Sequence, residues 1–268
     1  MMSSPNSEAQ SIKIHSEQSD QYKWRTPYIP DLLDSLCREL FIGKRNLVLD
    51  LGCGTGELAK HISRYAGKVI AIDGSRSMIG EARDTDNIEF QVVDLNASDP
   101  NLNGRADHFF FGRSIHWFSP ETLQRLSERY LNENGKIVVC STQWSPIGPW
   151  GKIYLDTKRE YVPSSRKPSG LDFKGEGNLG AANFISTKKM IARANVRIDS
   201  EYLANHTLSI TYREELEQLR KTFDKFKLDL KNALAPYEER REIVINIVSW
   251  ALIYERKKQE CPSIEELQ

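Results

Sequence analysis

The chain of 268 residues has no excess of either charge, because 37 lysines and arginines balance 37 aspartates and glutamates. Such a surface produces no field that attracts a phosphate backbone or an anionic membrane, so neither is expected as a partner. No apolar run approaches the roughly 20 residues that a membrane-spanning helix needs. The polar N-terminus also lacks the apolar stretch of a signal peptide. We therefore expect a mobile arm over residues 1–20 and a cytoplasmic protein.

Cysteine is scarce and scattered through the chain. The four cysteines are Cys37, Cys53, Cys140 and Cys261. They form no CxxC pair, and no histidine lies at the spacing of a metal site, so we expect no metal and no disulfide framework. A hydrophobic fraction of 39% with 28% charged residues is typical of a globular domain.

Short apolar runs alternate with helical patterns in the first half of the chain. The runs predicted as strands are NLVLDL, VIAID, FQVVD, HFFFG and KIVVCST, and the Asn134-Gly135 pair is expected to turn the chain before the last of them. This alternation predicts an α/β fold with a doubly wound, mostly parallel sheet. Ligands of such sheets bind at the carboxyl ends of the strands, so the informative residues are those that follow each strand.

The alternation ends after Thr142. We expect a helix over Ile185–Ala194, a sixth strand over Arg197–His206, a charged amphipathic helix over Tyr212–Leu234 and a seventh strand over Ile243–Glu255. A buried helix fits the last segment nearly as well. The chain is then a single domain, residues 21–268, with lid segments at about 144–190 and 212–242.

A glycine-rich turn joins the first strand to its helix in the sequence DLGCGTG. Its glycines allow close approach of a ligand, and the helix N-terminus offers free N–H groups to an anion. The spacing is GxGxG rather than the GxGxxG of dinucleotide enzymes. Asp50 precedes the first glycine, where a carboxylate repels a pyrophosphate but attracts an ammonium group.

Two further carboxylates end the next two predicted strands. Asp73 stands 21 residues after Gly52, where an acidic residue binds a ribose diol. Asp94 is placed to accept a hydrogen bond from an adenine amino group. Adenine, ribose and a zwitterionic amino acid together indicate S-adenosylmethionine, although any single glycine or aspartate here can merely cap a turn.

At these residues the sequence resembles a known family. VLDLGCGTGELA, IAIDGSRSMI, VVDLNA and NENGKIVV resemble the successive motifs of class I S-adenosylmethionine-dependent methyltransferases, over about residues 22–143. DQYKWRTPYIPDLL and GRSIHWFS are similar to segments of small-molecule members such as the trans-aconitate methyltransferase-like group. The resemblance implies a seven-stranded Rossmann-like sheet with a helical lid.

The resemblance also implies a set of cofactor-binding residues. Asp50, Gly52 and Gly54 would surround the methionine part, Asp73 would hold the ribose, and Tyr22 would cover the cofactor. The whole set implied for S-adenosylmethionine is Tyr22, Asp50, Gly52, Cys53, Gly54, Asp73, Gly74, Met78, Asp94, Leu95, Gly112 and Arg113. Arg113 departs from the small or polar residue usual below the sulfonium.

Methyl transfer is an in-line displacement on an activated sulfonium, so positioning in a dry pocket supplies much of the catalysis. A base is needed only if the acceptor atom carries a proton. His116 is the candidate base, and a role in capping or packing under Trp117 is about as well supported. Tryptophans line the expected acceptor pocket: Trp24, Trp117, Trp144 and Trp150.

Three other functions compete with this one. A short-chain dehydrogenase would use Ser141, Tyr154 and Lys158, which match YxxxK and its serine, but the glycine turn has the wrong spacing and place. A non-catalytic S-adenosylmethionine-binding protein would carry the same turn. A nucleic-acid methyltransferase would carry an Asn/Asp-Pro-Pro-aromatic run where GRSIHW stands. The sequence thus favours methyl transfer to an O or N of a small-molecule acceptor, such as a secondary metabolite, and leaves the oligomeric state open.

Overall fold

The protein is described by a computed structural model that covers residues 19–82, 85–163, 176–211, 213–237 and 242–257. Most of the expected N-terminal arm therefore lies outside the described residues, as does Cys261. The described chain begins with a short 3-10 helix, η1 (Ser19–Trp24).

One seven-stranded sheet forms the centre of the molecule, with strand order β3-β2-β1-β4-β5-β7-β6. The first five strands run parallel, and β7 is antiparallel to both of its neighbours. Their bounds are β1 Leu47–Leu51, β2 Lys68–Asp73, β3 Ile88–Val92, β4 Ala106–Gly112, β5 Leu131–Trp144, β6 Phe184–Ile198 and β7 Ile243–Arg256. The predicted mostly parallel, doubly wound sheet of seven strands is confirmed, and so is the seventh strand.

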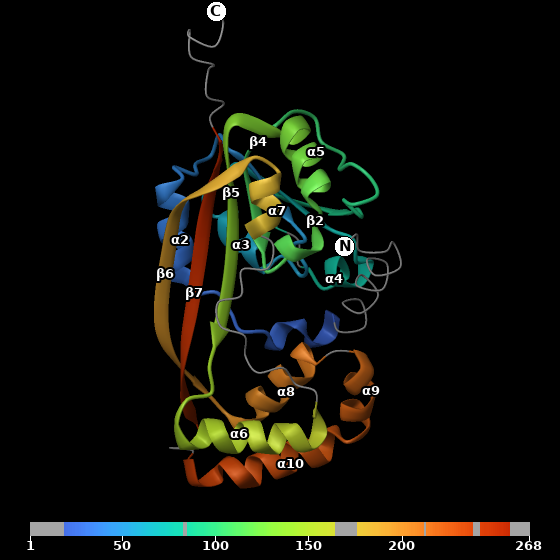
Figure 1. The fold of residues 1–268 in the computed structure, drawn as a ribbon, viewed down its shortest axis with the longest axis vertical. Coiled ribbons are helices and arrows are strands. Elements are labelled where there is room, and N and C mark those ends of the chain that lie inside the picture. Colours follow the sequence, from blue (N-terminus) through green and yellow to red (C-terminus); the bar gives the residue numbers. More distant parts are fainter. Residues whose placement is uncertain (1–18, 83–84, 164–175, 212, 238–241, 258–268) are drawn as a thin grey trace, which may run out of the picture.

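Helices cover both faces of this sheet (Figure 1). α2 (Pro30–Glu39) and α3 (Glu57–Ile62) pack on one face, with α4 (Arg76–Gly80) beside β2 and β3; α5 (Pro120–Tyr130) and α7 (Glu176–Ala181) pack on the other. The side chains of β4 alternate accordingly, because Phe109 and Phe111 enter the α5 side and Phe110 the α2 side. All three rings are at most 1% exposed, as expected for a central parallel strand.

A second, helical layer lies beyond the carboxyl ends of β1, β2 and β4 (Figure 1). It contains α6 (Gly148–Tyr161), α8 (Ser200–Ile210), α9 (Arg213–Lys221) and α10 (Phe223–Leu234). The long strands β5, β6 and β7 extend from the sheet into this layer. Buried residues of α8 and α10 pack there against Ile243, Ile245 and Ile247 of β7. We call these four helices the lid.

Two secondary-structure predictions in this region are wrong. Ile185–Ala194, expected as a helix, lies in β6, which pairs with β7 from Phe184 to Ile198. Arg197–His206, expected as a strand, lies mostly in α8. β6 is an edge strand whose first half, Ile185–Lys189, is exposed throughout, while Met190–Ile198 alternates between partly buried and exposed side chains. The alternation covers only part of the strand, so the period-2 signal in the sequence is weak. Asp199 then caps α8 by accepting a hydrogen bond from Tyr202 N at 2.7 Å.

The lid bounds change as a result. Only α6 of the expected segment 144–190 belongs to the lid among the described residues, and α8 joins it. The amphipathic helix expected over Tyr212–Leu234 is two helices that break at Thr222. The turn expected at Asn134-Gly135 falls inside β5, where the register against β4 shifts between Ala106 and His108.

Candidate functional site

The glycine-rich turn is folded tightly against its neighbours. Gly52 and Gly54 have φ values of 70° and 57°, in the left-handed region that side chains with a Cβ rarely adopt. A Cβ on Gly52 would stand 2.6 Å from Cβ of Ser114. The backbone N–H groups of Gly52 and Cys53 both donate to the carbonyl of Ile72, at 2.8 and 3.0 Å. The turn therefore joins the ends of β1 and β2.

Asp50 lies fully buried beneath this turn. Its Oδ2 accepts a hydrogen bond from Ala59 N at 3.0 Å, while Oδ1 has no partner among the described residues. Burial raises the pKa of Asp50 to about 7, and the carboxylates of Asp73 and Glu57 push in the same direction. An unpartnered, buried carboxyl oxygen at this position suits a cationic group of a ligand.

Asp73 lies beside the turn at the end of β2. Its Oδ2 accepts from Gly54 N and its Oδ1 from Ser75 N, both at 2.8 Å. Burial raises the pKa of Asp73 against these two hydrogen bonds. Gly74 follows it, and Met78, 2% exposed, packs one turn into α4. The residues that the resemblance implies at the ends of β1 and β2 therefore lie next to one another.

Asp94 and Leu95 follow β3, which ends at Val92. Asp94 Oδ1 accepts from Asn96 N at 3.1 Å, and Val93 N donates to Asp73 O at 3.0 Å. Leu95 is 4% exposed, and Arg125 of α5 binds its carbonyl at 2.5 Å. The third strand end therefore lies beside the second, on the same edge of the sheet.

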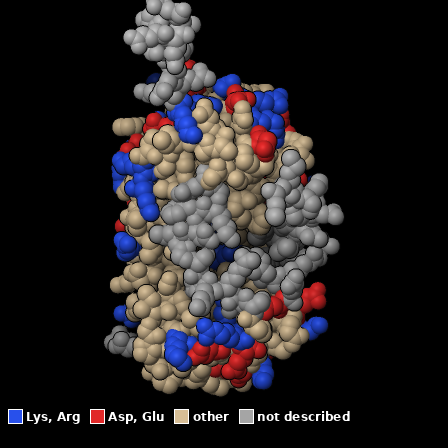
Figure 2. Space-filling view, in the orientation of Figure 1, with Lys and Arg blue, Asp and Glu red and all other residues tan. Residues whose placement is uncertain are grey.

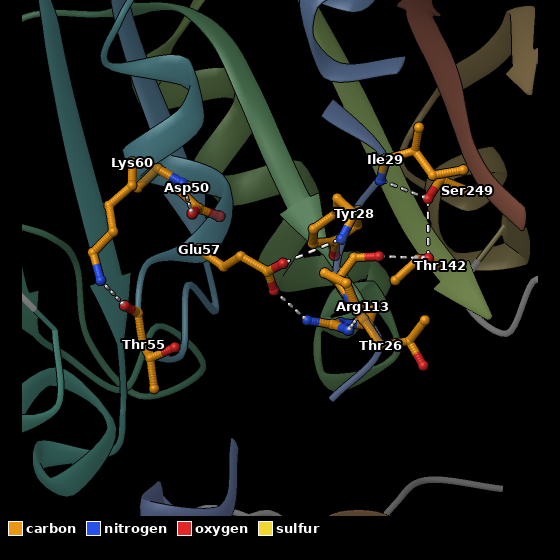
Figure 3. A network of polar contacts seen from close by, with 12 residues as sticks. Thr26, Tyr28, Ile29, Asp50, Thr55, Glu57, Lys60, Arg113, Thr142 and Ser249 are labelled. Atoms are coloured by element: carbon orange, nitrogen blue, oxygen red, sulfur yellow. Dashed lines mark hydrogen bonds and ion pairs between the residues drawn. The ribbon is translucent and has the colours of Figure 1, made fainter. Parts of the chain in front are cut away.

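Arg113 follows Gly112 at the end of β4 with a φ of 61°, an unusual conformation for a residue with a side chain. Its guanidinium donates to Glu57 Oε2 at 2.9 Å and to Thr26 O at 2.8 Å (Figure 3). It also lies over the rings of Tyr22 and Tyr28, at 5.5 and 4.8 Å. Burial opposes its charge, but Tyr22, Tyr28 and Glu57 together raise the pKa of Arg113.

The segment Thr26–Ile29 runs along the sheet edge beside this ion pair, and we call it the strap. Tyr28 N donates to Glu57 Oε1 at 3.1 Å. Thr142 Oγ1 of β5 donates to Pro27 O at 3.0 Å. Ser249 Oγ of β7 donates to Thr142 Oγ1 at 2.9 Å and accepts from Ile29 N at 3.0 Å (Figure 3).

The strap places η1 over the glycine turn. A Cβ on Gly54 would lie 3.5 Å from Cζ of Tyr22, so the Tyr22 ring lies against the turn. Trp24 packs edge-on against Tyr202 of the lid, with ring centroids 6.1 Å apart. η1 is therefore the element that separates the sheet edge from the lid.

His116 lies in the 3-10 helix η2 (Ile115–Trp117), which follows β4. Its side chain is exposed among the described residues and its ring lies 4.3 Å from that of Trp117. Asn96 Nδ2 donates to Trp117 O at 3.0 Å, which ties η2 to the segment after β3. His116 thus lies at the sheet edge where β4 ends, near the segment that follows β3.

The sequence analysis missed four residues that hold this site together: Thr26, Glu57, Thr142 and Ser249. Pairs such as Ile29 and Ser249 are 220 positions apart, and a single serine or threonine carries no local signal. Of these four residues, only Glu57 carries a local sequence signal, since it stands in the first turn of α3. An acidic residue there indicates helix-dipole stabilisation rather than an ion pair.

The residues of the dehydrogenase alternative do not reach the glycine turn. Tyr154 is in the lid, where its hydroxyl pairs with Thr207 Oγ1 at 2.9 Å, and Lys158 follows one turn later on α6. Ser141 faces Trp250 across the β5–β7 pairing. That alternative is wrong on this geometry.

No group of three or more histidine, cysteine, aspartate or glutamate side chains is placed to hold a metal within the described ranges. Cys37, Cys53 and Cys140 are buried free thiols. Burial raises the pKa of Cys53 well above its usual range, so this thiol of the turn is poorly nucleophilic. None of the helices in the described chain is long and apolar enough to cross a membrane.

Comparison with known proteins agrees with this geometry. Residues 48–135 match a family model described as a methyltransferase domain. The chain is 32% identical over 127 residues to a Dictyostelium discoideum protein named provisionally as a methyltransferase, covering 46% of each chain. It is 24% identical over 210 residues to an uncharacterized methyltransferase of Schizosaccharomyces pombe, covering 74% of this chain and 83% of that one.

The chain spans about half the length of its more similar relatives, 46% of the Dictyostelium protein and 53% of a methyltransferase of Alkaliphilus oremlandii. A solved structure from Anaeromyxobacter dehalogenans, described provisionally as a type II methyltransferase, superposes with a TM-score of 0.62 at 15% identity. It covers 87% of this chain and 97% of that one, which shows the fold. Residues 48–135, which hold the glycine turn and β2 to β4, are therefore similar to a methyltransferase domain.

Proposed function

We propose that the protein transfers the methyl group of S-adenosylmethionine to an oxygen or nitrogen of a small-molecule acceptor, with secondary metabolites as the first class to screen. The observation that carries this proposal is the convergence of three strand ends on one turn. Gly54 N donates to Asp73 Oδ2 at 2.8 Å, which links the turn to the end of β2, and Asp50 lies buried beneath the turn.

The residues present fit the cofactor. The unpartnered Oδ1 of Asp50 suits the ammonium group of the methionine part. Asp73 and Asp94 offer carboxylate oxygens on adjacent strand ends, which suit the hydroxyl and amino donors of an adenosyl group. The Tyr22 ring over Gly54 would exclude water from this side.

The bound cofactor would supply an electrophilic methyl group that needs no further activation. The protein's own contribution is then to hold the acceptor in line and to keep the site dry. The strap and η1 perform that enclosure. His116 would accept a proton only from an acceptor that carries one.

The test is isothermal titration of the purified protein with S-adenosylmethionine and S-adenosylhomocysteine, with NADPH as the control ligand. We expect both adenosyl ligands to bind, NADPH not to bind, and Asp73→Ala to weaken the adenosyl ligands at least tenfold. Incubation with acceptor pools, read by mass spectrometry, should then yield products heavier by one methyl group. Cofactor binding without any product would instead support a non-catalytic binding protein.

His116 is tested separately, with His116→Gln in the same transfer assay. A loss of transfer with unchanged cofactor binding supports its role as base. An unchanged transfer rate removes that role and leaves the cofactor site as it is.

A further inference from the structure

A cleft lies at the end of the sheet opposite to the glycine turn, where β4 and β5 begin and β7 ends. Its volume is about 570 Å³, and its lining residues are Arg105, Glu128, Asn132, Glu133 and Arg256. They come from the segment before β4, from α5, from the start of β5 and from the last position of β7. Since β4 has seven residues, the cleft is roughly 20 Å from the glycine turn. We call it the polar cleft.

The two arginines of the polar cleft are held in place by neighbouring groups. Arg256 Nη2 donates to Ser127 O of α5 at 2.5 Å, and its guanidinium lies over the Phe184 ring at 5.2 Å from the centroid. Arg105 Nη1 donates to Leu131 O at 2.8 Å. A guanidinium has five N–H donors in a fixed geometry, so most donors of both side chains stay available to a ligand.

The two glutamates supply the opposite charge. Glu128 accepts a hydrogen bond from Gln124 Nε2 at 2.8 Å, and the carboxylate of Glu133 has no partner among the described residues. Asn132 Nδ2 donates to Asp107 Oδ1 at 2.9 Å, which leaves Oδ1 of Asn132 as a further acceptor. The polar cleft therefore offers acceptors as well as donors.

The opposite charges are near one another without being paired. Burial lowers the pKa of Arg256 and Arg105 lowers it further by repulsion, whereas Glu128 and Glu133 act in the opposite direction. Both carboxylates are thus close enough to act on Arg256. Nevertheless, no ion pair within 4 Å joins either arginine to either glutamate in the part of the chain that the structure describes. A molecule that spans the cleft would supply the missing partner to both.

Other charges at this end of the molecule are paired. Lys136 Nζ lies 2.9 Å from Glu255 Oε1, and Arg125 and Arg129 both pair with Asp99. Figure 2 shows basic and acidic atoms mixed over this upper end, where α5 lies in Figure 1. The polar cleft differs from these pairs because its cations and anions are held apart.

We propose that the polar cleft binds a small zwitterion, a free amino acid or a dipeptide, with its carboxylate on the two arginines and its ammonium group on the two glutamates. Arginine binds a carboxylate through two parallel, charge-assisted hydrogen bonds. A simple anion is repelled by the glutamates and a simple cation by the arginines. The described lining side chains are all polar, so the ligand needs no large apolar part. This site is separate from the glycine turn, and the proposal does not depend on the proposed function.

The test is an NMR titration of isotope-labelled protein at pH 7 with L-alanine and matched analogues. L-Alaninamide keeps only the cation, N-acetyl-L-alanine keeps only the anion, and L-alanyl-L-alanine carries both charges farther apart. We expect L-alanine or the dipeptide to bind about tenfold or more tightly than either singly charged analogue. The tighter of the two then distinguishes an amino acid from a dipeptide. The shifted backbone amides should be those of residues 131–133 and 256.

Arg105→Gln and Glu133→Gln each remove one charge at an exposed position of the cleft, so the fold should be kept. Both should weaken zwitterion binding about fivefold or more. On the singly charged analogues they should differ, because Glu133→Gln favours the anion and Arg105→Gln favours the cation. Arg129→Gln is the matched control, since Arg129 is in α5 but does not line the cleft, and it should bind as the wild type does.

Two outcomes overturn the proposal: no binding of either zwitterion, or singly charged analogues that bind as tightly. An effect of Arg129→Gln equal to that of Arg105→Gln would reveal a general charge effect and also contradict it. Amide shifts at residues 52–54 instead of 131–133 would assign the zwitterion to the glycine turn. Since these titrations contain no adenosyl ligand, a failure of the proposed function leaves their result unchanged.

Discussion

The guanidinium of Arg113 pairs with the carboxylate of Glu57, with Nη2 2.9 Å from Oε2, where the end of β4 meets the first turn of α3. The two side chains are 16% and 36% exposed. Glu57 also accepts from Tyr28 N, and Arg113 also donates to Thr26 O. The ion pair therefore fastens the strap to the sheet edge as well as neutralising a largely buried cation.

Glu57→Gln should destabilise the protein by about 1–3 kcal/mol, because it leaves Arg113 without its counter-charge in a largely buried place. The measurement is urea unfolding at neutral pH. Glu89→Gln is the control, since Glu89 pairs with Lys68 at an exposed position and its loss should cost less than about 1 kcal/mol. Equal losses in both variants would show that the Arg113 pair is no stronger than a surface one.

Gly52→Ala should destabilise the protein by about 2 kcal/mol or more, from left-handed backbone strain and from contact with Ser114. The same change at Gly80 should have the opposite sign. Gly80 ends α4 with no atom within 4 Å of an added Cβ and without a positive φ, so alanine there should stabilise by about 0.4–1 kcal/mol. The measurement is thermal unfolding of the two variants. If both lose stability, the loss in Gly52→Ala does not come from the left-handed backbone or from the contact with Ser114.

The first half of the fold was readable because its strands are central and buried on both faces. Val48 and Phe110, for example, are 0% exposed, and such strands appear as continuous apolar runs. β6 was not predicted, because Ile185–Lys189 is exposed throughout and Met190–Ile198 only alternates between partly buried and exposed side chains, a weaker signal than a fully buried apolar run. Its length is set by pairing with β7, a contact between distant segments that no local pattern encodes.

The candidate site also has a part that could be predicted from the sequence and a part that could not. Asp50, Asp73 and the glycines stand in local motifs, so their spacing identified them as candidate site residues. The contact between Thr26 and His206 joins residues 180 positions apart, and it depends on how α8 packs against the strap. Since Arg197–His206 was expected as a strand, this contact of α8 could not be predicted from the sequence.

Ser249→Ala should destabilise the protein by about 1–3 kcal/mol, because it removes the partner of Ile29 N and of Thr142 Oγ1 in a fully buried place. Ser186→Ala in β6 is the matched control, since that serine is exposed and should change stability by less than about 0.5 kcal/mol. Limited proteolysis provides a second measurement. Faster cleavage near the strap in Ser249→Ala, with the control unchanged, would locate the loss there.

The raised pKa of Asp50 predicts a pH dependence of stability with a definite sign. In the unfolded chain the carboxyl ionises near its ordinary value of 3.8, whereas burial raises its pKa in the fold to about 7. Between these values the folded state binds more protons than the unfolded state, so this group's contribution to stability is present at low pH and falls as pH rises. Asp50→Asn lacks that loss, and its stability relative to the wild type should increase by up to about 1.4 kcal/mol per pH unit across the window.

Asp156→Asn tests the sign by contrast. Asp156 is on the exposed face of α6, where a hydrogen bond from Lys152 lowers its pKa. Its contribution is therefore present above the ordinary pKa and is lost as pH falls through the folded value. Urea unfolding from pH 4 to pH 8 should show a stability difference that rises with pH for Asp50→Asn and stays nearly flat for Asp156→Asn, because the window of Asp156 lies below its ordinary value of 3.8. Parallel slopes would mean that Asp50 is ionised in the fold, with a cation or water beside its Oδ1 at neutral pH.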